Sequence, residues 1–325
     1  MSVRVAGRLA ASLLCIALGT VGLAGCASAP ARSDLATNVW PGYEPIYLAK
    51  ELGYLDPSVI RLRELPSSTT VLDAFRGGRI DIAALTLDEA LRLEHDGIGI
   101  RIILVMDVSN GADVVMARPG VRSLADLRGK RIGVESGALG AYMLSRALDH
   151  AGLSPSDVTV ISIPVDQHEQ AYVSGAVDAV VTFEPVRTRL LSRGARVLFD
   201  SSQIPNEIFD VLVVRETVFD GSPTIVTDLT SAWYRALDYY HAHPEDALRR
   251  MAAREDVTPQ AFLASLEGLK IPSQAEDDRL LGGNDPAILA PAQRLADVML
   301  KAGVIGGPVD PRPLLGLASQ KGAGQ

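Results

Sequence analysis

The sequence predicts an α/β protein of two lobes, with mixed sheets flanked by helices and a helical C-terminal part. Three observations lead to this prediction. From residue 35 onward, short runs rich in β-branched residues alternate with amphipathic helical runs. The alternation starts afresh at residue 121, after the segment 118–120, which follows a strand-like run with no helix between. Beyond Arg215 the strand-like runs stop and helical patterns follow.

The N-terminal segment indicates export. Arg4 and Arg8 precede an apolar stretch of signal-peptide length at 9–21, and Leu23-Ala24-Gly25-Cys26 resembles the lipobox of bacterial lipoproteins. We therefore expect a lipoprotein signal peptide at 1–25, lipidation of Cys26, and a flexible tether at 26–34. The alternative is an uncleaved membrane anchor, because no charge lies between Arg8 and Arg32. Both interpretations place the protein outside the cytoplasm and attached to a membrane.

The composition excludes several classes of site and partner. Removing residues 1–25 leaves 300 residues, enough for two lobes, and also removes Cys15, so that Cys26 is the one remaining cysteine. This excludes a disulfide framework or a thiolate metal site in the mature chain, and we expect neither a metal nor a cofactor. The net charge of −8 becomes about −10 once Arg4 and Arg8 are lost. An acidic chain lacks the basic face that nucleic acids require, so no nucleic-acid partner is expected.

The expected elements follow from local patterns. Apolar residues at helical spacing predict one helix around 46–52 and another around 139–148. Strands are predicted at 36–40, 60–64, 80–85, 101–108, 113–117, 131–134, 158–163, 179–183, 195–199 and 211–215. The C-terminal part predicts helices at 227–243, 244–254, 258–269 and 287–302. With the crossing placed at Arg118, lobe 1 comprises 35–117 and 212–325, and lobe 2 comprises 118–211.

Four segments, taken in their order and spacing, resemble the nitrate/sulfonate/taurine-type receptors of ABC importers, a family that includes binders of thiamine pyrimidine precursors. The segment 123–134 is similar to the opening of the second lobe in such receptors. The other three are the opening strand, loop and helix at 40–55, the strand at 80–84, and the run 178–185, where relatives carry a D-A-x-x-x-W-x-P motif. The resemblance covers about residues 36–215.

This resemblance implies a periplasmic-binding-protein fold of type II, in which two lobes joined by a hinge clamp a small-molecule ligand. It further implies a monomer that delivers a small polar organic solute, such as a sulfonate, a zwitterionic amine or a pyrimidine, to an ABC permease. The alternative is a ligand-sensing subunit of a membrane signalling system, since both roles need a closing cleft. Fungal relatives that act as enzymes carry a cysteine-rich motif, which this chain lacks. We therefore expect no enzymatic activity.

Candidate ligand-binding residues come from the loops that follow strands, because ligands of open α/β lobes lie beyond the carboxyl ends of strands, near helix N-termini. In each loop a purely structural role is the alternative: aromatic side chains that cap the sheet, Ser and Thr that cap helices, and acids favoured by the helix dipole. The candidates are Trp40, Gly42, Tyr43, Glu44, Ser67, Ser68, Thr69, Thr86, Asn110, Ser136, Gly137, Ala138 and Glu184.

The charge of the ligand is a separate expectation. The candidate loops hold no Lys or Arg, whereas Glu44 and Glu184 supply carboxylates. We expect these two acids to face the ligand and to pair with a cationic or hydrogen-donating nitrogen, with Trp40 and Tyr43 adding cation–π attraction. The alternative is that both carboxylates face solvent and the ligand is a plain sulfonate.

Overall fold

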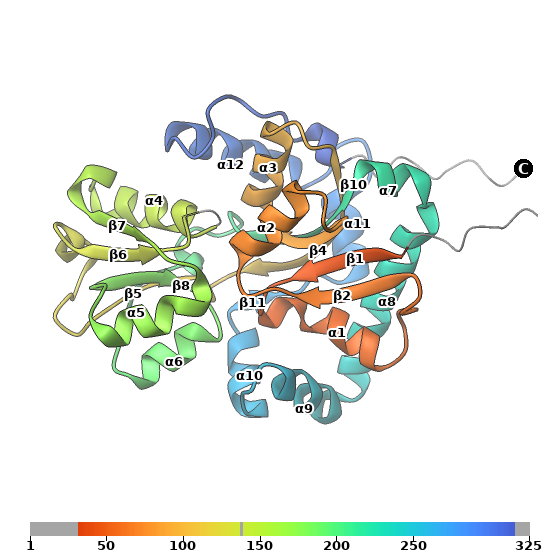
Figure 1. Ribbon diagram of the computed structural model, residues 1–325, viewed down its shortest axis with the longest axis horizontal. Coiled ribbons are helices and arrows are strands. Elements are labelled where there is room, and N and C mark those ends of the chain that lie inside the picture. The colour runs from red at the N-terminus through yellow and green to blue at the C-terminus, as the bar shows by residue number, and fades with distance from the viewer. Residues whose placement is uncertain (1–31, 137–138, 316–325) are drawn as a thin grey trace, which may run out of the picture. The chain divides into compact units, whose positions relative to one another are not determined.

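The computed structural model describes residues 32–136 and 139–315, which form two sheets flanked by helices (Figure 1). The signal peptide, the lipobox with Cys26, and the candidate residues Gly137 and Ala138 lie outside the described residues. The α/β class with two lobes and a helical C-terminal part is confirmed.

The first sheet belongs to lobe 1 and has six strands in the described chain, in the order β11-β4-β10-β3-β1-β2. β1 pairs in parallel with β2 and with β3, whereas β10 runs antiparallel between β3 and β4. The strands are β1 Ser33–Thr37, β2 Ile60–Glu64, β3 Ile82–Thr86, β4 Ile100–Ser109, β10 Phe209–Arg215 and β11 Leu269–Lys270.

The second sheet belongs to lobe 2 and has five strands in the described chain, in the order β7-β6-β8-β5-β9. β6 pairs in parallel with β7 and β8, and β5 runs antiparallel to β8 and β9. The strands are β5 Val114–Ala117, β6 Arg131–Val134, β7 Thr159–Ser162, β8 Ala179–Thr182 and β9 Arg196–Asp200.

Helices cover both faces of each sheet, and strand alternation explains why. Along β3, Ala83 and Leu85 belong to one apolar cluster while Ile82 and Ala84 belong to another, because successive side chains point to opposite faces. In lobe 1 these faces are covered by α2 Ser68–Arg76, α3 Leu87–His95, α11 Gln274–Leu281 and α12 Leu289–Lys301 on one side, and by α1 Glu44–Glu51, α8 Pro223–Ala242, α9 Pro244–Arg254 and α10 Pro259–Leu266 on the other.

Lobe 2 follows the same principle. Val115 and Ala117 of β5 join the cluster under one helix, while Val114 and Met116 join the cluster on the opposite face. The helices are α4 Leu139–Ala151 on the first face, and α5 His168–Ser174 and α6 Val186–Ser192 on the second (Figure 1). The remaining described helix, α7 Glu216–Gly221, follows β10 in lobe 1.

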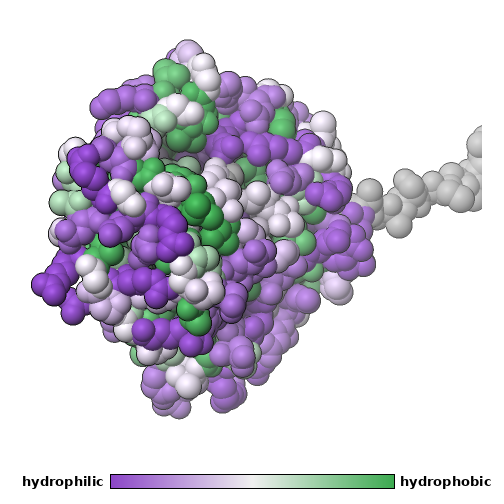
Figure 2. All heavy atoms as spheres, turned by 60° about the vertical axis from the view of Figure 1, so that its left-hand side comes forward, coloured by the Kyte–Doolittle hydropathy of each residue, from purple (hydrophilic) through white to green (hydrophobic). Residues whose placement is uncertain are grey.

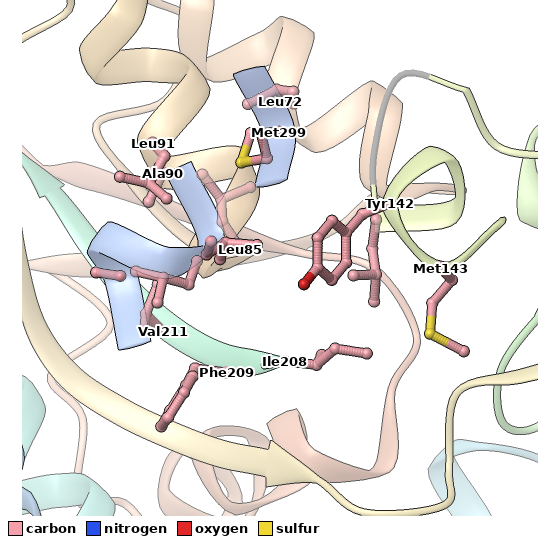
Figure 3. Packing of buried hydrophobic residues seen from close by; sticks show 14 of the residues in the cluster. Leu72, Leu85, Ala90, Leu91, Tyr142, Met143, Ile208, Phe209, Val211 and Met299 are labelled. Carbon is pink, nitrogen blue, oxygen red and sulfur yellow. The ribbon is translucent and has the colours of Figure 1, made fainter. Parts of the chain in front are cut away.

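One apolar cluster is continuous between the lobes. Tyr142 and Met143 of α4 belong to the same cluster as Leu85 of β3 and Leu91 of α3 (Figure 3). Ile208, which precedes β10, lies in this cluster as well. Burial of apolar surface therefore holds the lobes together on this side of the fold.

The chain crosses between the lobes at 110–113 and again at 201–208, and the two crossing segments are hydrogen-bonded to each other. The hydroxyl oxygens of Ser109 and Ser201 lie 2.7 Å apart, and the Gly111 N–H donates to Ser201 Oγ over 2.6 Å. Both serines are buried. Ser201 thus joins the two segments about which the lobes would have to turn.

The positions of the crossings correct two expected boundaries. Ala117 was assigned to lobe 1, but the strand that it ends pairs with β8 and β9 of the second sheet. The expected lobe 2 extends to residue 211, but Phe209, Asp210 and Val211 pair with β4 in the first sheet. Both crossings are short polar segments that resemble turns between neighbouring strands, so the sequence does not reveal the change of sheet. The expected end of strands at Arg215 is also wrong, because β11 adds a short edge strand.

The surface is predominantly polar on the face that Figure 2 shows, with scattered apolar patches. The large hydrophobic residues that are exposed come from separate elements, namely Val160, Val173, Leu191, Leu263 and Leu300. Within residues 32–136 and 139–315, no helix combines the length and the apolar character needed to span a bilayer.

The linked crossing segments lead to a stability prediction. Ser201→Ala should lower the free energy of unfolding by about 1–3 kcal/mol, because it leaves the buried Ser109 hydroxyl and Gly111 N–H without their partner. The matched control is Ser202→Ala, whose exposed hydroxyl bonds to Asp200 and should matter by about 0.5 kcal/mol or less. Urea denaturation of the two variants measures both effects. Equal midpoints would contradict the role given to Ser201.

Candidate functional site

Two adjoining cavities lie where the strand ends of both sheets meet. Both cavities are small. Ser68, Asp113, Leu139 and Phe183 line both of them. The first is completed by Asn38, Trp40, Tyr43, Thr86 and Asp210, and the second by Glu135, Gly140, Met143, His168, Val181 and Thr182. Residues of both lobes therefore enclose one small, mixed polar and aromatic space.

Aromatic side chains form the walls. The Trp40 ring of lobe 1 meets the Phe183 ring of lobe 2 edge to face, with centroids 5.5 Å apart and planes at 88°. Trp40 Nε1–H donates to Asp107 Oδ2 over 2.9 Å, and the Tyr43 hydroxyl donates to Asp210 Oδ1. These bonds fix both rings of lobe 1 at the cavity.

Gly42 is needed for this arrangement. A β-carbon at this position would lie 1.8 Å from Asp107 Oδ2 and 2.6 Å from Trp40 Nε1. The close backbone approach expected at Gly42 is therefore an approach to the bonded pair Trp40–Asp107, which lies beside the cavity.

Carboxylates supply most of the charge around the cavities. Asp113 is 3% exposed, lines both cavities, and its Oδ2 has no hydrogen-bond partner among the described residues. Asp210 lines the first cavity and lies directly opposite Asp107 in the β10–β4 register. Asp88 and Glu89, in the first turn of α3, are buried nearby, and each also has one oxygen without a partner.

Burial changes how these acids titrate. Loss of solvation raises the pKa of Asp107 to about 7, against the opposing effect of the Trp40 hydrogen bond. It likewise raises the pKa of Asp113 to about 7, with repulsion from Asp107 and Asp88 adding to it. Burial, followed by repulsion from Asp107 and Asp113, raises the pKa of Asp210, and burial with repulsion from Asp88 raises that of Glu89 to about 8.

Glu135 connects the two lobes. It follows β6 in lobe 2, and its Oε1 accepts the Thr69 N–H at the start of α2 in lobe 1 over 2.7 Å. Its Oε2 accepts the Val165 N–H over 3.2 Å. The Thr70 N–H is taken by the Ser67 side chain over 3.2 Å, so that Ser67 is the N-cap of α2. The N–H groups of Thr69 and Thr70 are therefore already bound within the chain.

His168 is neutral at neutral pH. Burial lowers its pKa to about 4. One ring nitrogen lies 3.1 Å from Thr182 Oγ1 and the other 2.9 Å from the Ile163 carbonyl oxygen. Both nitrogens are thus satisfied by the protein, and the ring brings no positive charge to the cavity.

The expectation that Glu44 and Glu184 face the ligand is wrong, and so is the alternative that they face solvent. Glu44 is fully buried, and its oxygens accept from Arg254 Nε over 2.8 and 2.7 Å. Glu184 is 1% exposed and accepts from Arg187 Nη1 over 2.8 Å and from the Thr188 N–H over 3.1 Å. Both carboxylates are neutralised by arginines of their own chain, and neither lines the cavities.

The other candidates divide into three groups. Trp40, Tyr43, Ser68 and Thr86 lie around the first cavity, and the Thr86 N–H also donates a capping hydrogen bond to Glu89 Oε2 over 2.9 Å. Gly42, Ser67 and Thr69 are not among its lining residues: Gly42 lies against the Trp40–Asp107 pair, Ser67 caps α2, and the Thr69 N–H bonds to Glu135. Asn110 is exposed in the first crossing segment, and Ser136 lines a separate hollow with Ala141 and Leu144.

Sequence reasoning missed several residues that line the cavities, chiefly Asp113, Asp210 and Glu135. The sequence does contain a signal for them, because each is an acid at or beside one end of a strongly apolar strand. A buried charge is costly there unless it is paired or binds a ligand. Among the described residues, no group of His, Cys, Asp and Glu side chains has an arrangement that could hold a metal ion.

Comparison with known proteins gives relatives of two kinds. A putative binding protein of Brucella abortus is 26% identical over 212 residues, which cover 62% of this chain and 64% of the relative, slightly less than two thirds of its length. The taurine-binding periplasmic protein of Escherichia coli is 24% identical over 253 residues, covering 77% of this chain and 74% of that protein.

Solved structures share the fold. The alkanesulfonate-binding protein SsuA from Xanthomonas axonopodis pv. citri, bound to MOPS, has a TM-score of 0.73 at 20% identity over 89% of this chain and 99% of that chain. A desulfurization enzyme, DSZB, has a TM-score of 0.59 at 20% identity over 86% and 94%. The family model of NMT1-like proteins matches residues 27–255, well over half of the sequence. The chain belongs to the NMT1-like family.

Proposed function

We propose that this protein is an extracytoplasmic solute-binding receptor that captures a small polar organic solute and delivers it to an ABC permease. The observation that carries the proposal is the enclosed cavity between two lobes, with aromatic walls and unpartnered polar atoms. Small-molecule sites have this composition: apolar walls that hold the ligand and a few polar groups that orient it.

The route of the chain supports the same role. The lobes are joined by the crossing segments at 110–113 and 201–208, which meet at Ser201. At the cavity, the Trp40 ring contacts the Phe183 ring and the Glu135 carboxylate accepts the Thr69 N–H, and both contacts run from one lobe to the other. Such an arrangement lets a ligand favour the closed state by adding contacts to both lobes at once. The binding-protein relatives favour uptake as the use of this closure.

A binding role rather than catalysis is part of the proposal, and it needs a direct test because a desulfurization enzyme shares the fold. Both cysteines, at positions 15 and 26, precede the described residues, so the described cavity lining offers no thiol nucleophile. A receptor releases its ligand chemically unchanged, whereas an enzyme converts it to a product. Mass spectrometry of any bound solute after long incubation separates the two roles, since a chemically altered solute would favour an enzyme.

The first prediction of this proposal concerns ligand binding. In a thermal-shift screen of sulfonates, amines, pyrimidines and oxyanions, at least one solute should stabilise the folded protein. At a hundredfold excess over Kd the gain is about 2.7 kcal/mol, because the ligand binds the folded state alone. Trp40 provides a second readout, as its fluorescence should change on binding in the wild type but not in Trp40→Phe, in which Trp233 remains.

A separate measurement tests whether the lobes close on the ligand. Small-angle scattering with a confirmed ligand should show a smaller radius of gyration than without it, because the lobes come together around the solute. An unchanged profile at saturation would argue against a clamp.

The second prediction concerns the anchor. We expect Cys26 to be acylated and to hold the protein at a membrane surface, on the basis of the lipobox-like run 23–26. Metabolic palmitate labelling should therefore mark the wild type and Cys15→Ser but not Cys26→Ser. The Cys15 variant is the matched control, because it removes the other cysteine of the chain. Equal labelling of all three proteins would refute the anchor.

A further inference from the structure

We propose that the ligand of this cavity carries a positively charged nitrogen, of the ammonium, amidinium or protonated heteroaromatic amine type, and that the carboxylate of Asp113 binds it. This inference rests on the proposed function and specifies the chemical class of its ligand. It is argued from one carboxylate oxygen without a partner, from the charged residues of the cavity lining, and from the hydrogen bonds already made at the start of helix α2.

Asp113 is placed to act as a ligand-binding group. It lies in the segment that leads from the first crossing into β5, and it lines both cavities. Its side chain is almost completely buried, yet Oδ2 has no hydrogen-bond partner. A buried acceptor without a partner is costly, and the space that it faces is the ligand cavity. A donor from a bound solute would satisfy it.

The charges around the cavity favour a cation. Among the described residues that line the two cavities are three carboxylates, Asp113, Asp210 and Glu135, and neither a lysine nor an arginine. The nearby arginines bind other acids: Arg254 pairs with Glu44, and Arg187 with Glu184. A plain anion would therefore enter a partly dry space that offers it no lysine or arginine, and above about pH 7, where Asp113 loses its proton, it would meet like charge.

The start of helix α2 is the natural alternative site for an anionic head, but it is occupied. The Thr69 N–H donates to Glu135, and the Thr70 N–H donates to Ser67. A sulfonate would have to displace the Glu135 carboxylate, an interaction that also joins the lobes. The Glu135 carboxylate thus occupies the site at the start of α2 that the head of an anionic ligand would otherwise use.

The aromatic walls are compatible with a cationic ligand. Trp40 and Tyr43 line the first cavity, and their polar atoms are already bonded to Asp107 and Asp210. The rings therefore offer only their carbon surfaces to a solute, and such surfaces attract a desolvated cation.

Matched pairs of compounds test the sign of the ligand. We would measure, by calorimetry on the purified full chain, the affinities of taurine against isethionate and of benzamidine against benzenesulfonate. Each pair is similar in size, but only the first member carries a cationic nitrogen. We expect the nitrogen-bearing member of at least one pair to bind tenfold tighter or more. Tighter binding of the plain sulfonates, or no binding by either nitrogen compound, overturns the proposal.

A substitution tests the part played by Asp113. Asp113→Asn keeps the shape of the side chain but removes its charge, so affinity for the nitrogen-bearing compound should fall about 30-fold or more, as for one partner of a buried charge pair. Asp56→Asn is the control, because Asp56 is exposed and bonds only to Ser58 in its own turn. Equal affinity in the wild type and Asp113→Asn would refute the role of this residue.

The pH dependence of the wild type gives a test that needs no variant. Asp107 of β4, Asp210 of β10 and Asp88 of α3 interact electrostatically with Asp113. Arg92 in turn acts on Asp88, and Glu89 interacts with Asp88 and Asp210. Glu135 and neutral His168 line the second cavity together with Asp113. Because burial raises the pKa of Asp113 and of Asp107 to about 7, raising the pH from 5.5 to 8 deprotonates these acids. Affinity for benzamidine, which stays cationic over this range, should then rise, and an affinity that falls would contradict the proposal.

The ligand-free protein should show the opposite trend in stability. A carboxyl group whose pKa is raised in the folded state binds its proton more tightly there than in the unfolded chain. The free energy of unfolding therefore decreases as the pH rises from the unfolded pKa, about 4, towards the folded pKa. The urea midpoint should therefore fall between pH 5 and pH 8, and Asp113→Asn should weaken this fall, while Asp56→Asn should not. A midpoint that rises with pH, or the same pH dependence of the midpoint in all three proteins, would show that Asp113 does not have a raised pKa in the folded protein.

These outcomes also separate this inference from the proposed function. If a plain sulfonate binds best and closes the lobes, the receptor role stands and the cationic ligand is wrong. If no solute of the full thermal-shift screen binds, the receptor role itself fails. The calorimetric comparison of taurine, isethionate, benzamidine and benzenesulfonate, carried out on the wild type and Asp113→Asn, decides the charge of the ligand.

Discussion

The cost of removing carboxylates from water governs the centre of this protein. Asp107, Asp113 and Asp210 lie where the antiparallel strand β10 meets β4 and the first crossing, and all are buried. Trp40 and Tyr43 each donate one hydrogen bond to this group, which reduces the cost and at the same time orients both rings. The shape of the cavity wall and its charge therefore have the same origin. A change to any of these acids would alter the position of an aromatic ring as well as the electrostatics.

Arginines from distant parts of the chain complete the loops that surround this centre. Arg254, at the end of α9, holds Glu44 at the start of α1 and also contacts Glu64 of β2. Its guanidinium lies 3.5 Å from the centre of the Tyr47 ring. The helical C-terminal part thus fixes the loop that carries Trp40 and Tyr43, although it contributes no residue to the cavity lining described here.

Local patterns predicted most of the fold, and the failures have a common cause. Strands such as β2 and β6 and helix α9 lie at their predicted residues because alternation and caps are local properties. The lobe boundaries were displaced because the crossings at 110–113 and 201–208 are short polar segments, which look in the sequence like ordinary turns between strands of one sheet. At the site, Trp40, Tyr43, Ser68 and Thr86 were found from strand ends, whereas the partners of Glu44 and Glu184 depend on arginines that local patterns cannot place.

Glu135 has a consequence for how receptors of this shape diverge. Its carboxylate caps α2 across the gap between the lobes, in the place where the head of an acidic solute would otherwise be held. Replacing that one side chain by a small neutral one would free the Thr69 N–H at the helix end and remove one contact between the lobes, but the residue belongs to none of the apolar clusters of the two sheets. The proposed preference for a cationic ligand would thus depend on single side chains at the site and not on the architecture of the two sheets.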